Sequence, residues 1–203
     1  IIVILFFMYF QQFRNDYLGS SRVMLLTCTL FLVFPLITYA IVVHSDISPY
    51  MLPYCITPIF IRIFMDSRTA FIAHLMTVLM CVPAVSQPAE FLTIQSLAGL
   101  TAIISLQQLN ERSELFRAIL IVLAVSVLTY ISIQLINRRV LFIEDVNYTD
   151  LISIAISCLL MMIAYLLLIP IERIFGFTSN VTLIELSNAN SPILRRMSEE
   201  APG

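Results

Sequence analysis

Apolar residues fall into seven runs along this chain, and short polar stretches separate the runs. An α-helix needs about 20 mainly apolar residues to cross the hydrocarbon core of a membrane, with about 17 to 25 as the usual range. The pattern therefore predicts an all-α polytopic membrane protein, a bundle of seven transmembrane helices. The predicted helices cover residues 1–10, 23–43, 50–65, 69–85, 91–107, 115–136 and 150–171.

Two of these runs depart from an ordinary transmembrane helix. The first has only ten residues, which at about 1.5 Å per residue cross half of a hydrocarbon core of about 30 Å. We therefore expect the first helix to be truncated and further sequence to precede Ile1. The third run contains Pro53 and Pro58. Because proline lacks an amide donor and kinks or breaks a helix, we expect that segment to be irregular.

Composition excludes an ordinary soluble domain. Of the 203 residues, 60% are hydrophobic and only 12% are charged, whereas soluble domains are about half apolar and about a quarter charged. A soluble core has no room for that excess, so we expect membrane lipid to contact the outward-facing side chains. All 11 basic residues are arginines in this sequence. Most of them lie in the breaks between runs, which is not the pattern of a nucleic-acid-binding patch.

The arginines also predict the orientation of the bundle, since cytoplasmic loops retain positive charge. If the first helix runs from outside to inside, only Arg138 and Arg139 fall on the outer side. An even number of helices would place the arginines that follow the last helix on the outer side of the membrane and would remove this bias. Seven helices with a cytoplasmic C-terminus is therefore the self-consistent count. The cytoplasmic ends then carry Arg14, Arg22, Arg62, Arg68, Arg112, Arg117, Arg173, Arg195 and Arg196.

No pattern in the sequence indicates a catalytic, cofactor-binding or metal-binding site within this chain. His44 and His74 lie towards opposite membrane faces in the predicted topology and have no second metal ligand nearby. The cysteines lack the paired spacing of a zinc site and of a disulfide framework. We expect them to be small buried hydrophobic residues. They are Cys28, Cys55, Cys81 and Cys158.

The character of the chain changes at Glu172 and Arg173, after the last apolar run. We therefore divide it into a transmembrane domain, residues 1–173, and a short helical cytoplasmic tail, residues 174–203. Thr182 and Glu185 fit a capping box at the start of one tail helix. A second helix start has Ser191 as cap and a proline at the first helical position. An apolar stripe on that second helix requires a packing partner, and it consists of Ile193, Leu194 and Met197.

This tail is similar to a junction found in one bacterial family. Residues Phe175–Asn188, followed by Ser191–Arg196 and Glu200–Gly203, resemble the segment that leads into the hydrolase domain of bacterial seven-transmembrane HD-hydrolase receptors. That family includes PgpH-type cyclic di-AMP phosphodiesterases. The break at Asp66–Ala70, between the third and fourth predicted helices, is also similar to the family pattern.

The resemblance implies a function that the chain itself cannot complete. An HD domain would hold paired divalent metal ions with His and Asp side chains, and a metal-activated water would attack a phosphodiester. We expect those ligands to lie beyond Gly203. The resemblance also implies an extracytoplasmic sensor domain in the same polypeptide and a location in the bacterial inner membrane, and it is compatible with a homo-oligomer. The chain would then anchor the hydrolase and transmit a signal to it.

Several charged residues are candidates for that transmission. Arg62 and Asp66 are four positions apart, with Arg68 close by, at the predicted cytoplasmic edge of the third and fourth helices. They form either an ion-pair latch or a simple positive anchor with a solvated counter-charge, and exposed pairs of this kind contribute about 0 to 1 kcal/mol. Glu172 and Arg173 lie on the only covalent path to the hydrolase. Leu194, on the tail stripe, completes the set of candidate coupling residues.

A second class of function is a transporter-like or small-molecule-binding membrane bundle. Polar side chains inside apolar runs can mark a ligand path, and His74, Gln95 and Gln134 are placed in that way. They can equally form hydrogen bonds between helices, typically worth about 0.6 kcal/mol. Several intramembrane charges or an inverted repeat would favour a transporter. Neither is evident in the sequence.

Overall fold

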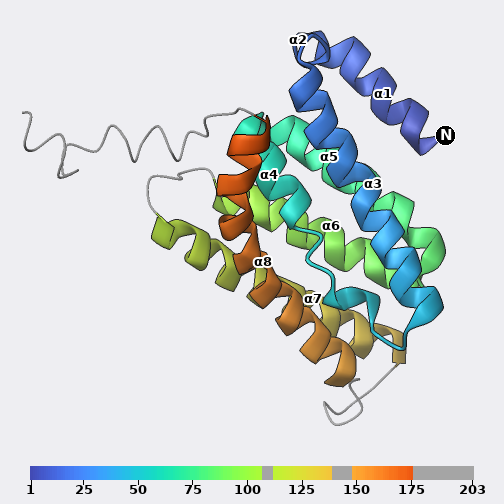
Figure 1. Cartoon of the computed structure of the whole chain (residues 1–203). Coiled ribbons are helices and arrows are strands. Elements are labelled where there is room, and N and C mark those ends of the chain that lie inside the picture. The colour runs from blue at the N-terminus through green and yellow to red at the C-terminus, as the bar shows by residue number, and fades with distance from the viewer. Residues whose placement is uncertain (107–111, 139–147, 176–203) are drawn as a thin grey trace, which may run out of the picture.

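The computed structural model describes residues 1–106, 112–138 and 148–175, and every regular element in these ranges is a helix. Ten helical segments follow one another and pack as a single bundle (Figure 1). They are α1 (Ile2–Phe13), α2 (Asn15–Leu18), α3 (Ser21–His44), η1 (Pro49–Met51), α4 (Ile56–Phe64), α5 (Ser67–Cys81), η2 (Val82–Ala84), α6 (Pro88–Ser105), α7 (Arg112–Arg138) and α8 (Tyr148–Phe175).

Each apolar run of the sequence coincides with a helical segment, and the all-α prediction is confirmed for the described residues. The third run is irregular, as its prolines predict. It consists of the 3-10 turn η1, a non-helical stretch that contains Pro53, and the nine-residue helix α4. Pro58 is tolerated because it lies in the first turn of α4, where backbone amides have no partner within the helix.

The helices differ in their ability to cross a membrane. By length and apolar character, three helical segments of the described chain can do so: Ser21–His44, Ser67–Ala84 and Phe116–Ile136. Ile2–Phe13, Pro49–Phe64 and Tyr148–Ile163 are apolar but shorter. The structure thus establishes an apolar helical bundle, and the count of seven membrane crossings stays a prediction.

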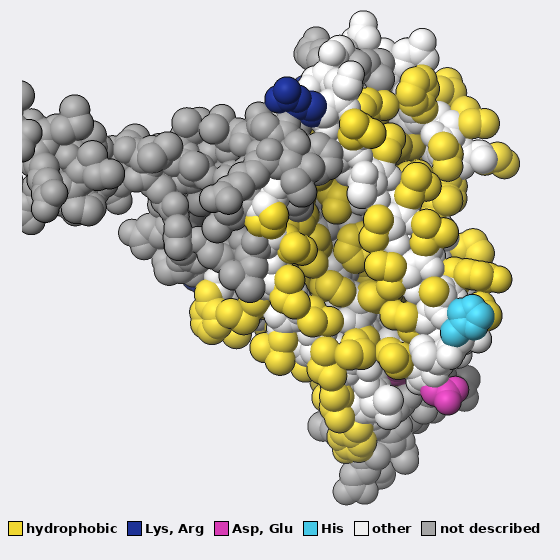
Figure 2. Space-filling model, viewed as in Figure 1, with side chains coloured by type: hydrophobic (Ala, Val, Ile, Leu, Met, Phe, Trp, Pro, Cys, Tyr) yellow, Lys and Arg dark blue, Asp and Glu magenta, His cyan; other side chains and the backbone are white. Residues whose placement is uncertain are grey.

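The outer surface of the bundle is strongly apolar. Among the described residues on the face seen in Figure 2, hydrophobic side chains predominate, including those of α3 and α8. Leu36 and Leu128 are exposed over 67% and 65% of their surface. A soluble monomer rarely exposes contiguous apolar patches of more than a few hundred Å². The surface therefore fits a lipid environment. On the visible face, basic side chains lie at the end of the bundle near α2, and acidic and histidine side chains lie at the opposite end.

The core has two parts. The larger part joins α3 through α8 around Tyr54, whose ring packs edge-on against Phe91 at a centroid distance of 5.2 Å. The smaller part attaches α1, where Phe6 stacks on Phe31 of α3 at 4.6 Å and Phe10 is fully buried. Helix α1 is therefore held by aromatic packing on α3 and α5, and it lies at the margin of the bundle (Figure 1).

Helices α5 and α6 are in close contact at Gly99. The imidazole of His74 lies against its α-carbon, so that a β-carbon there would come within 2.1 Å of the ring. His74 is fully buried, and its Nε2 donates a hydrogen bond to the backbone oxygen of Gln95, 2.8 Å away. Small residues at such crossings allow two backbones to approach. Ala98 and Ala102, on the same helix as Gly99, are also buried.

Candidate coupling site

The turn between α4 and α5 is built around Asp66. Helix α4 ends at Phe64, and Asp66 takes the extended conformation that precedes a helix, with φ −134° and ψ 164°. Its carboxylate accepts hydrogen bonds from the backbone amides of Arg68 (3.1 Å) and Thr69 (3.4 Å) and from the Thr69 hydroxyl (2.6 Å). Aspartate is among the preferred N-cap residues, because its oxygen satisfies amides that have no partner within the helix. The start of α5 therefore fixes the position of this carboxylate.

The same carboxylate fastens α1 to α5. Arg14, directly after α1, donates from Nη2 to Asp66 Oδ2 in an ion pair that joins residues 52 positions apart. Beside it, the Tyr9 hydroxyl lies 3.3 Å from the Thr69 hydroxyl. The Arg14 and Asp66 side chains are 27% and 26% exposed, so solvent partly screens their attraction. We call these four residues, Tyr9, Arg14, Asp66 and Thr69, the α1–α5 clasp.

Opposing effects act on the ionisation of Asp66. Partial burial by itself raises the pKa of the carboxyl group, because it penalises the charged form. The hydrogen bonds from the Thr69 hydroxyl and amide and the positive charge of Arg14 act the other way and prevail. The pKa of Asp66 is therefore lower than its ordinary value. The clasp is thus maintained by a carboxylate that stays charged at neutral pH.

We expect the clasp to weaken in acid. A carboxyl group whose pKa is lower in the folded than in the unfolded state stabilises the fold above the unfolded value of about 3.9, and this contribution disappears as the pH falls through the lower folded value. In thermal unfolding in detergent, wild type should be more stable than Asp66→Asn at neutral pH. This difference in stability should disappear between about pH 5 and pH 2. A difference between the two proteins that stays constant over this range would contradict the assignment.

Two other candidate coupling residues, Arg62 and Arg68, lie close to Asp66 in the sequence but do not take part in its ion pair. Among the described residues, the ion pair of Asp66 is with Arg14. A spacing of four brings side chains together only within one continuous helix, and the chain leaves α4 at Met65, between Arg62 and Asp66. Arg62 lies in the last turn of α4 with a buried Nε that has no hydrogen-bond partner in the described structure. Arg68 is exposed in the first turn of α5.

The candidates after the membrane domain are only partly described. Glu172 and Arg173 belong to α8, which continues to Phe175, two residues beyond the predicted domain boundary. Leu194 lies outside the described residues. The end of α8 is at the same end of the bundle as α2 and the α4–α5 turn (Figure 1). The clasp and the exit of the last helix thus share one end of the molecule.

A second group of hydrogen-bonded polar side chains, the second polar layer, lies at the end of the bundle opposite the clasp. Glu90, in the first turn of α6, accepts hydrogen bonds from the Tyr50 hydroxyl (3.2 Å) and from Gln134 Nε2 (3.1 Å). Asp150, in the first turn of α8, accepts one from the Ser48 hydroxyl at 2.7 Å. Carboxylates are favourable in the first turn of a helix because of its dipole. This layer joins η1 and the segment before it to α6, α7 and α8.

Two of the three polar residues inside the apolar runs link helices through their side chains. Gln134 binds Glu90, and His74 binds the backbone of α6. Gln95 lines a cavity of about 10 Å³ together with Ser126 and Ser157. Such a space accommodates about one water molecule, so this cavity cannot take an organic ligand.

In the sequence alone, Arg14 belongs only to the positive-inside pattern, and the apolar pattern does not single out Tyr9, Thr69, Glu90 or Asp150. Local signals were available for the acids, because a carboxylate in the first helical turn is a common capping feature. No local signal pairs Arg14 with Asp66, since 52 positions separate them.

Comparison with known proteins decides the family. Residues 1–179 match the model of the 7TM receptor with intracellular HD hydrolase. The chain belongs to this family. Its members are membrane proteins, and the resemblance inferred from the tail and the Asp66–Ala70 break is confirmed by a match that runs through all the described helices.

One curated relative of the chain is the cyclic-di-AMP phosphodiesterase PgpH of Bacillus subtilis (strain 168), which is 25% identical over 161 residues. The alignment covers 76% of this chain and 22% of the relative, so the chain spans about a fifth of that protein's length. No solved structure gives a significant match.

Proposed function

We propose that this chain is the membrane anchor and signal-transmitting region of a membrane-bound HD phosphohydrolase. It crosses the bacterial inner membrane seven times, with its C-terminus in the cytoplasm, and the connector from residue 174 onward leads into the hydrolase domain. The observation that carries this proposal is the family match over residues 1–179, which includes every described helix and the exit of α8.

The hydrolase of the complete protein acts on a cyclic dinucleotide, and we assign cyclic di-AMP because of the similarity to a cyclic-di-AMP phosphodiesterase. Divalent metal ions in the HD domain would activate the attacking water. Among the described residues of this chain, no group of three or more His, Cys, Asp and Glu is placed to hold a metal ion. We assign to the residues of this chain a role in positioning the hydrolase.

The clasp supplies a physical route for the signal. A displacement of α1, the helix nearest the extracytoplasmic sensor in the family architecture, reaches α5 through the Arg14–Asp66 ion pair and the Tyr9–Thr69 hydrogen bond. Partly exposed ion pairs contribute about 0 to 1 kcal/mol, so the clasp is weak enough to open and close. Arg62, Arg68, Glu172 and Arg173 extend the coupling region towards the exit of α8.

The topology can be tested with reporter fusions. A reporter fused after Gly203 should be cytoplasmic, and one inserted between Glu144 and Asn147 should be extracytoplasmic, because the arginine bias fixes the orientation. The measurement is the activity of a compartment-sensitive enzyme such as alkaline phosphatase. Two reporters on the same side of the membrane would contradict seven crossings.

The function is tested by phosphodiesterase activity of the full-length protein in membranes. We expect hydrolysis of cyclic di-AMP, and we expect Asp66→Ala to shift that activity, by up to about fivefold, towards the activity of the isolated HD domain. Ser67→Ala, one position away and outside the clasp, is the matched control and should behave as wild type. Absence of cyclic di-AMP hydrolysis by the wild-type protein would refute the assigned function. A wild-type response in Asp66→Ala would refute only the role of the clasp.

A further inference from the structure

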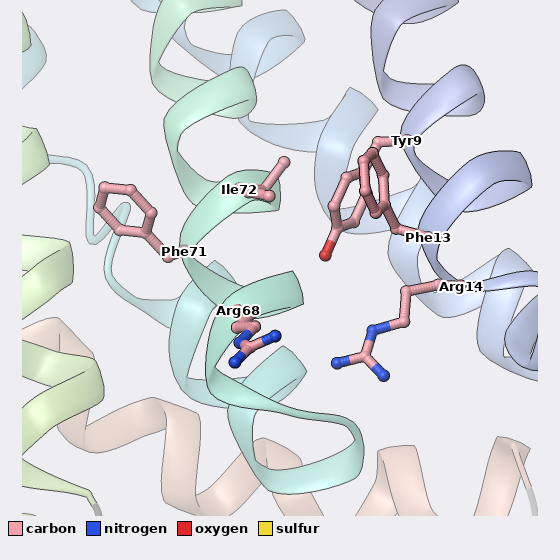
Figure 3. A pocket seen from close by; sticks show the side chains of 6 residues that line it. All are labelled: Tyr9, Phe13, Arg14, Arg68, Phe71 and Ile72. Atoms are coloured by element: carbon pink, nitrogen blue, oxygen red, sulfur yellow. The ribbon is translucent and has the colours of Figure 1, made fainter.

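An open groove of about 520 Å³ runs between the end of α1 and the start of α5. Its walls come from two helices that meet only at the margin of the bundle, so the groove faces the surroundings and not the core (Figure 3). It is lined by two arginines, three aromatic side chains and one isoleucine: Tyr9, Phe13, Arg14, Arg68, Phe71 and Ile72.

The charges at the groove leave a net positive site. The guanidinium groups of Arg14 and Arg68 lie at the same end of the groove, beyond the rings of Tyr9 and Phe13 (Figure 3). Asp66 neutralises Arg14, whereas Arg68 is exposed and forms no ion pair within the described structure. These three side chains together carry one excess positive charge. Guanidinium groups are well suited to phosphate, since their planar donors match its oxygens.

The rest of the groove is apolar and continuous with the lipid-facing surface of α1. Phe13 is 71% exposed, and the preceding turns of α1 present further exposed side chains. These include Ile4, Leu5, Phe7 and Met8, each about half exposed or more. A small soluble anion would contact the arginines and leave the apolar side chains of the groove uncovered. An amphiphile would contact both parts of the groove, with its charged group at the arginines and its hydrocarbon along α1.

We propose that this groove binds an anionic phospholipid. Its phosphate lies between Arg68 and the remaining donors of Arg14, and its acyl chains lie against Tyr9, Phe13 and Ile72. Basic pockets between membrane helices on the cytoplasmic side are suited to anionic head groups, and the positive-inside pattern predicts that this end of the bundle is cytoplasmic. The bound lipid touches the clasp through Arg14, so it bridges α1 and α5 beside the ion pair.

The proposal is tested by native mass spectrometry of the full-length protein in detergent, titrated with dioleoyl phosphatidylglycerol or with dioleoyl phosphatidylcholine. These lipids share their acyl chains and differ in head-group charge. Wild type should prefer phosphatidylglycerol about fivefold, since the groove carries one excess positive charge and each such charge near an anionic head group strengthens binding by about fivefold. Arg68→Gln should lose about fivefold of that preference, and Arg68→Lys should keep most of it.

Arg22→Gln is the matched control, because Arg22 is an exposed arginine near the start of α3 that does not line the groove. It should leave the preference unchanged. Equal losses in Arg22→Gln and Arg68→Gln would overturn the proposal, since the effect would then be general charge. No preference in the wild-type protein, as expected if another part of the chain covers the groove, would also overturn it. So would displacement of the lipid by millimolar inorganic phosphate, which would indicate a site for a free anion.

Discussion

Gly99→Ala should destabilise the bundle by about 2 to 4 kcal/mol. The added methyl group would lie 2.1 Å from the His74 ring, and fitting extra atoms into a packed core costs about 1 to 3 kcal/mol. If His74 rotates away to make room, it loses its hydrogen bond to the Gln95 oxygen, which adds about 0.5 to 1.5 kcal/mol. The measurement is thermal or denaturant unfolding in detergent.

Gly19→Ala is the control for this substitution. Gly19 is exposed and has φ −69° and ψ −17°, a conformation that alanine adopts without strain, so its replacement should have little effect. Adding His74→Ala to Gly99→Ala removes the ring that the methyl group meets, and the double variant should therefore lose less stability than the sum of the two single variants. Equal stability of Gly99→Ala and Gly19→Ala would show that the α5–α6 contact is looser than the structure indicates.

On the proposed function, Leu194→Asp should uncouple the hydrolase from the membrane domain while membrane insertion survives. Leu194 lies outside the described residues, and the prediction rests on the apolar stripe that it forms with Ile193 and Met197 in the sequence. If the stripe packs on a partner, an unpaired charge there costs about 2 to 4 kcal/mol, because the carboxylate loses its hydration without compensation. The measurement is phosphodiesterase activity of the full-length protein in membranes, compared with that of the isolated HD domain.

The control for Leu194→Asp is Arg196→Asp, which introduces the same side chain on the polar face of the predicted tail helix. Arg196→Asp should retain wild-type activity and response. If Leu194→Asp also retains both, the stripe is a solvated linker. The connector hypothesis would then fail even though the family assignment stands.

The positions of the helices could be predicted because burial in lipid requires long apolar runs, and such runs are visible in a single sequence. The break before α4 was also foreseeable, since Pro53 removes a backbone donor in the middle of a run. The number of membrane crossings could not be established in this way. Helix α4 has nine residues, so it does not span the hydrocarbon core as a single straight helix.

The partners of the charged residues were less predictable than the helices. The spacing of Arg62 and Asp66 indicated a local pair, but the helix ends between them and Asp66 caps the next helix. Its ion partner, Arg14, lies 52 positions earlier, directly after helix α1. Packing of Phe6 and Phe10 against α3 and α5 brings that helix into reach. Tertiary packing, which leaves no local mark in the sequence, therefore decides which charges meet.

The non-helical stretch before α4 also constrains the order in which the protein assembles. Its backbone at Leu52 accepts a hydrogen bond from Ser157 of α8, 2.9 Å away, and Tyr54 and Cys55 beside it are buried. Irregular backbone at membrane depth is tolerated only where protein or water satisfies it. The ribosome makes Ser157 105 residues after Leu52. In the proposed topology the third segment therefore acquires this hydrogen-bond donor only after α8 has been synthesised and has docked against it.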